Sequence, residues 1–109
     1  MNVGVTVRRG NVYLSKETYE CYFAGLDGAI LQRRGDDLLV LPVRHAPSGG
    51  YLLNRRNAAG DRVVSAVDFF RLHQIDEDFE LHPETQWDPA AAGLCARGVF
   101  ATSSMAANG

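Results

Sequence analysis

The sequence predicts a mainly β protein with two short helices, an α+β chain folded as a single compact barrel or sandwich. Three observations predict this class. Apolar residues alternate along several short segments, turns containing glycine separate those segments, and one order of strands and helix occurs twice. The 109 residues are 46% hydrophobic and 22% charged, which suits one domain with a modest core.

The first segments predict two strands followed by a helix. Valine occupies every second position from residue 3 to 7, and 12–14 is a second apolar run after the turn at 9–11. Ser15 predicts the N-cap of a helix, whose aromatic residues recur at helical spacing until the chain reaches 24–25.

A β-hairpin and a loop follow this helix. Residues 29–32 and 38–43 are apolar runs on either side of a turn at 33–37 that contains glycine and aspartate. The segment 44–50 combines proline, serine and glycine, and it predicts a hinge between two halves of the chain.

The second half predicts the same order of elements. Residues 51–53 and 62–64 are short apolar runs around a turn at 57–60. Ser65 stands three residues before Asp68, an arrangement similar to a capping box, and it predicts the N-cap of the second helix.

Beyond the second helix the pattern returns to strands. Residues 79–82 alternate as a strand does, 87–89 begins a turn, and 94–96 closes a second hairpin. The last residues, 102–109, are small and polar and predict a flexible tail.

This recurrence indicates an internal two-fold repeat. Residues 10–19 and 61–70 share a β pair, a small cap region, an acidic residue and an aromatic residue. A repeat of about 50 residues implies two β-β-helix-β-β units, each too small to bury its own apolar face. Chance similarity between two short units is the alternative. The expected organisation is one β-rich domain at 1–101, with repeat one at about 1–43, the hinge at 44–50 and repeat two at about 51–98.

Residues 57–71 resemble the signature of the AbrB/MraZ-like swapped-hairpin regulators, in which a turn with glycine and arginine precedes a β pair, a proline and a short helix. Arg62 matches the turn arginine, and three residues match the helix: Asp68, Phe69 and Arg71. The turn arginine is replaced by Asn11 in the first repeat, and the two prolines are replaced by Ser15 and Ala66. The resemblance implies an AbrB-like barrel that binds DNA through arginine-bearing loops.

The charges divide unevenly along the chain. The formal charge is −2 in total, with an excess of basic residues before residue 60 and an excess of acidic residues after it. The sequence pI of about 5.8 argues against a dedicated nucleic-acid binder. Seven arginines at or beside predicted turns are candidate binding residues, expected on one rim of the fold that suits phosphates or an acidic protein surface: Arg8, Arg9, Arg33, Arg34, Arg55, Arg56 and Arg62.

The residues therefore favour a small, non-enzymatic accessory or assembly module that binds a larger protein partner, with self-association as a homo-oligomer. The alternative is a DNA-binding transcriptional regulator, or an antitoxin-like protein, of the family that the chain resembles. Unpaired strand edges and exposed aromatic side chains are typical of the first class. Clustered turn arginines are expected for the second class.

Catalytic, metal and cofactor sites are not expected. No nucleophile–base motif or phosphate-binding loop is found, and His45, His73 and His82 lack the spacing of metal ligands. Cys21 and Cys95 are far apart in the sequence, so both are expected to be reduced and partly buried. With neither a signal peptide nor a membrane-spanning segment in the sequence, we expect a cytoplasmic protein.

Overall fold

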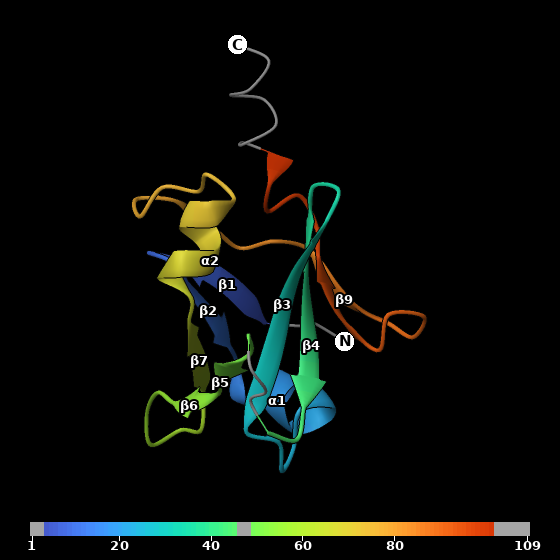
Figure 1. Ribbon diagram of the computed structural model, residues 1–109. Helices are drawn as coiled ribbons and strands as arrows, with labels where there is room; N and C mark the ends of the chain where they lie inside the picture. Colours follow the sequence, from blue (N-terminus) through green and yellow to red (C-terminus); the bar gives the residue numbers. More distant parts are fainter. Residues whose placement is uncertain (1–3, 46–48, 102–109) are drawn as a thin grey trace.

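Two antiparallel sheets of five strands form the body of the protein (Figure 1). The computed structural model describes residues 4–45 and 49–101, so Val3, the middle of the expected hinge and the expected tail lie outside the described residues. Sheet A has the order β6-β7-β2-β1-β8, and sheet B has the order β5-β3-β4-β10-β9. The prediction of a mainly β chain with two helices is confirmed.

The strands of sheet A are β1 (Val5–Arg8), β2 (Asn11–Leu14), β6 (Asn54–Arg55), β7 (Arg62–Ser65) and β8 (Glu80–Leu81). Those of sheet B are β3 (Gly28–Arg34), β4 (Asp37–Val43), β5 (Tyr51–Leu52), β9 (Thr85–Asp88) and β10 (Gly93–Ala96). The helices are α1 (Lys16–Tyr22) and α2 (Val67–Leu72), which lie at opposite ends of the molecule in Figure 1.

In the described part of the chain, the path passes from one sheet to the other three times, first from β2 through α1 to β3 and then at two short connections. Leu53 separates β5 from β6, and residues 82–84 separate β8 from β9. In the described part of the chain the strands form two sheets and not one closed barrel. The AbrB-like barrel therefore stays a prediction.

Each sheet combines strands from both halves of the chain. In sheet A, β2 pairs with β7, so that Val12 lies opposite Val64. In sheet B, β4 pairs with β10, so that Leu39 lies opposite Cys95. The first and second halves of the chain therefore pair with each other at the central strand of each sheet, β2 in sheet A and β4 in sheet B. The internal repeat itself stays a prediction.

One hydrophobic core fills the space between the sheets. Alternate residues of a strand face the same side of a sheet, and the buried valines and leucines of β1 and β2 follow this period. In sheet B, β4 and β10 also bury consecutive residues, so their outer side is partly covered as well. Three aromatic rings are the largest fully buried side chains: Phe23, Phe70 and Phe100. The ring centres of Tyr22 and Trp87 lie 5.1 Å apart, and the two rings stack beside the core. Trp87 was expected to begin a turn, but it belongs to strand β9, and the turn begins after Asp88.

The two expected helix caps have different outcomes. Ser15 is the N-cap of α1, and its Oγ accepts a hydrogen bond from the Thr18 amide at 3.2 Å. The N-cap expected at Ser65 is wrong, because Ser65 is the last residue of β7 and lies opposite Asn11. The next amide, of Ala66, donates to the Gly10 carbonyl at 2.9 Å, so strand pairing continues through the position where a cap was expected. Ala66 takes the N-cap position of α2, with no side-chain cap hydrogen bond.

Replacing Ser15 by alanine should lower the free energy of unfolding by about 1 kcal/mol, because the Thr18 amide loses its acceptor. Ser65→Ala is the matched control, and it should change the free energy by less than about 0.5 kcal/mol because Ser65 is exposed and caps nothing. Urea denaturation followed by circular dichroism measures both. Equal losses in the two variants would contradict the assignment of the caps.

Candidate functional site

The structure divides the seven candidate arginines between the two sheets. Arg8 ends β1 and Arg9 lies in the following turn, whereas Arg55, Arg56 and Arg62 belong to or follow strands β6 and β7. The remaining pair, Arg33 and Arg34, ends β3 at the hairpin of sheet B. The seven side chains therefore do not form one continuous rim.

The two arginines of sheet B contact groups of their own chain. The guanidinium carbon of Arg33 lies 4.9 Å from the centre of the Phe100 ring. A guanidinium nitrogen of Arg34 lies 2.8 Å from a carboxylate oxygen of Asp88. These contacts connect the β3–β4 hairpin to the rest of sheet B and to the end of the described chain.

Two arginines of sheet A also stabilise their own surroundings. Arg55 donates to the carbonyls of Asn57 and Ala58 at 3.1 and 3.0 Å, which holds the loop after β6. Arg62 lies over the Tyr19 ring at 4.0 Å and donates to the Gly60 carbonyl at 3.1 Å. Arg55 and Arg62 therefore stabilise the loop between β6 and β7, and this role accounts for part of their hydrogen-bonding capacity.

Arg8 and Arg56 meet at one tyrosine on the outer face of sheet A. Their guanidinium carbons lie 5.0 and 4.6 Å from the centre of the Tyr13 ring, within the range of a cation–π contact. Asn11 donates from Nδ2 to the Tyr13 hydroxyl oxygen at 3.3 Å. We call these four residues (Arg8, Asn11, Tyr13 and Arg56) the Tyr13 site.

The strand register explains why this site faces outward. Val12 and Leu14 of β2 point into the core, so Asn11 and Tyr13 point to the other side of the sheet. Thr6 lies opposite Tyr13 on β1, and Val63 lies opposite it on β7. Tyr13 was not predicted as the common contact of these arginines, although the alternation along 11–14 is the pattern that places it on the outer face.

One hydrogen-bond donor at the Tyr13 site is unsatisfied within the described part of the chain. The hydrogen bond from Asn11 and then the hydrogen bond from Arg8 hold the pKa of the Tyr13 phenol below its usual value, against the opposing effect of burial. Nε of Arg8 is shielded from solvent and has no hydrogen-bond acceptor among the described residues. The site therefore has donor groups in excess of acceptors.

A shallow groove of about 180 Å³ adjoins the Tyr13 ring. It is lined by Gly4, Thr6, Tyr13, Leu14, Ser15, Arg56 and Asp61. The Asp61 carboxylate accepts from Asn57 Nδ2 at 3.0 Å and from the Lys16 amide at 2.8 Å, and these two bonds lower the pKa of Asp61. Because both carboxylate oxygens already have donors, Asp61 serves mainly to join the loop after β6 to the start of α1.

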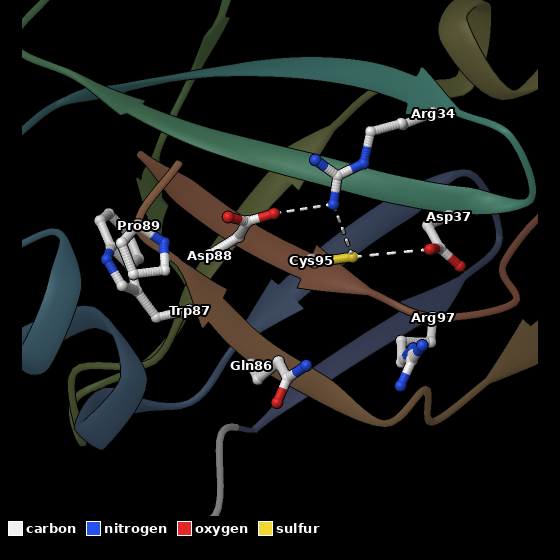
Figure 2. Close-up of a pocket in the computed structure, with 8 residues that line it drawn as sticks. All are labelled: Arg34, Asp37, Gln86, Trp87, Asp88, Pro89, Cys95 and Arg97. Atoms are coloured by element: carbon white, nitrogen blue, oxygen red, sulfur yellow. Dashed lines mark hydrogen bonds and ion pairs between the residues drawn. The ribbon is translucent and has the colours of Figure 1, made fainter. Parts of the chain in front are cut away.

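A second hollow, of about 380 Å³, lies on the outer face of sheet B around Cys95. Figure 2 shows Arg34 between Asp88 and Cys95, with its nitrogen 3.7 Å from the Cys95 sulfur. The Cys95 thiol donates to Asp37 at 3.7 Å, and Asp37 also accepts from the Gly98 amide at 2.9 Å. These polar groups satisfy one another, and no histidine lines the hollow to activate the thiol.

The other titratable residues form no cluster with evident chemistry. The described residues contain no group of three or more His, Cys, Asp or Glu side chains that could hold a metal ion. His73 packs between Phe69 and Phe100, and burial followed by the nearby Arg33 charge lowers its pKa. Cys21 is exposed and not partly buried as expected, and neither Cys21 nor Cys95 forms a disulfide bond.

Comparison with known proteins yields no relative: no protein-family model, no curated protein and no solved structure matches the chain significantly. Within residues 4–45 and 49–101, neither helix has the length and apolar character needed to cross a membrane. The Tyr13 site is therefore interpreted from its own geometry.

Proposed function

We propose that the protein is a non-enzymatic binding module that contacts a larger protein partner through the outer face of sheet A. The observation that carries this proposal is the contact of Tyr13 with the guanidinium groups of both Arg8 and Arg56 on an outward strand face. Tyrosine and arginine are the residues that most often dominate the energy of protein interfaces. Here the arginines also hold the ring in place, which reduces the entropy lost on binding.

The distribution of the arginines favours a protein partner over DNA. A duplex needs several phosphate contacts along an extended basic surface. Arg33 and Arg34 lie on the other sheet, and Arg55 and Arg62 bind carbonyl groups of their own loops. DNA binding by an AbrB-like regulator, which the sequence resemblance implies, is the second candidate, and self-association as a homo-oligomer is part of the first.

Affinity purification of the tagged full chain from its native host tests the proposal. Three baits are compared: the wild type, Tyr13→Ala, and Gln32→Ala as a matched control on an exposed position of sheet B. We expect a protein that the wild type and Gln32→Ala recover and Tyr13→Ala does not, and that then binds the purified wild-type chain directly. Circular dichroism confirms that the Tyr13 variant is folded.

Two results would contradict the proposal. Equal recovery of the same protein by all three baits would remove the Tyr13 site from the interface. Recovery of duplex DNA, with binding that weakens steeply as salt rises, would establish the DNA-binding alternative instead.

A further inference from the structure

The chemistry of the Tyr13 site limits what it can recognise. Guanidinium groups donate hydrogen bonds and accept none. Because Asn11 already donates to the Tyr13 hydroxyl oxygen, the hydrogen of that hydroxyl is available for an acceptor. Donors therefore outnumber acceptors among the groups of the Tyr13 site, and two of the side chains carry positive charge. A ligand that fits them brings acceptor oxygens and negative charge.

The surroundings limit the size of that ligand. Glu80 of β8 lies opposite Arg8 in the strand pairing, and its carboxylate is 3.3 Å from a ring nitrogen of His82. Asp61 lines the other side, in the groove beside Arg56. The positive region is thus short and has a carboxylate at each end. A duplex backbone, with its closely spaced phosphates, would meet these carboxylates as well as the arginines.

We propose, building on the function proposed above, that the Tyr13 site binds a carboxylate side chain in an acidic segment of the partner protein. The carboxylate accepts hydrogen bonds from the Arg56 guanidinium and from the Tyr13 hydroxyl, and the Arg8 charge attracts it to the ring. Charge-assisted hydrogen bonds to arginine are the stronger class, and the planar guanidinium matches a carboxylate.

Titration of the full-length, isotope-labelled protein with defined peptides tests this assignment by NMR. The probe is a blocked peptide with three consecutive glutamates, compared with the same peptide carrying glutamines and with inorganic phosphate at equal ionic strength. We expect the glutamate peptide to shift the amide signals of β2 and of the residues around Arg56. Its affinity should exceed that of the glutamine peptide by at least about tenfold, because each lost charge-assisted bond weakens binding by about that factor.

Three substitutions locate the contact. Arg56→Gln should lower the affinity for the glutamate peptide about tenfold. Tyr13→Phe should lower this affinity several-fold, because the ring stays and only the hydroxyl is lost. Arg97→Gln is the matched control, since Arg97 is an exposed arginine in the turn directly after β10, on the other sheet's side of the protein. It should leave the affinity unchanged.

The inference is overturned if the glutamine peptide binds equally well, if Arg97→Gln weakens binding as much as Arg56→Gln, or if phosphate produces the same shifts. It is also overturned if the isolated chain proves to be a stable oligomer that covers the Tyr13 site. A protein that is captured by the wild type and lost by Tyr13→Ala, together with peptides that do not bind, would retain the proposed function and reject the carboxylate.

Discussion

Replacing Phe70 by alanine is expected to lower the free energy of unfolding by about 3 to 5 kcal/mol, the range for removing a buried phenylalanine. The Phe70 side chain is 1% exposed on α2 and belongs to the single core between the sheets. The centre of its ring lies 5.4 Å from the centre of the Phe69 ring and 6.4 Å from that of the Phe100 ring, so the substitution leaves a cavity among aromatic neighbours. A domain of this size has about 5 to 15 kcal/mol of stability in total, so the loss is a large part of it.

Leu72 provides the control on the same helix. It is 78% exposed, so Leu72→Ala, which also truncates a large apolar side chain, should change the free energy of unfolding by less than about 0.5 kcal/mol. Urea denaturation of both variants, with the midpoint and slope fitted separately, makes the comparison. Similar losses in the two variants would mean that α2 is not packed as described.

Gly10→Ala should also destabilise the protein strongly, by about 2 to 4 kcal/mol. Gly10 has a φ of +77°, a conformation that costs an alanine about 1 to 2 kcal/mol. A Cβ atom at Gly10 would lie 2.7 Å from Cγ2 and 3.0 Å from Cα of Val67, the first residue of α2. The clash involves backbone, so α2 would have to move away from the turn between β1 and β2, at a further cost of about 1 to 3 kcal/mol.

Gly25 separates these two contributions. It has the same φ of +77°, and an added Cβ would meet no atom within 4 Å. Gly25→Ala should therefore lose only the conformational part, about 1 to 2 kcal/mol. Thermal and urea unfolding of both variants give the difference, and a Gly10 variant no less stable than the Gly25 variant would exclude close packing of α2 on the turn.

Local patterns in the sequence predicted several of the elements, because those patterns depend on neighbouring residues, but β6 and most of β9 were missed. Alternating valines predicted β1, and the position of Ser15 predicted the start of α1. The β3–β4 hairpin was predicted from its two apolar runs and the turn between them. In each case the side chains that decide the structure lie within a few residues of one another.

Features that depend on distant residues could not be predicted in this way. The cap expected at Ser65 was wrong because β7 pairs with β2, from the other half of the chain, through Ser65 itself. The arginines were expected on one rim, but their position depends on which sheet each hairpin joins. The contact of Arg56 with Tyr13 joins two segments far apart in the sequence, so no local spacing indicates it.

The pairing of both halves within each sheet has a consequence for how the protein folds. The hairpins β1–β2, β3–β4 and β9–β10 join neighbouring segments and close short loops. The pairings β2–β7 and β4–β10 join segments half a chain apart, and closing such long loops costs more entropy and slows folding. We therefore expect the three hairpins to form early and to pair with strands from the other half of the chain late in folding. Since Tyr13 is on β2 and Arg56 comes from the other half, the Tyr13 site is assembled only in that last step.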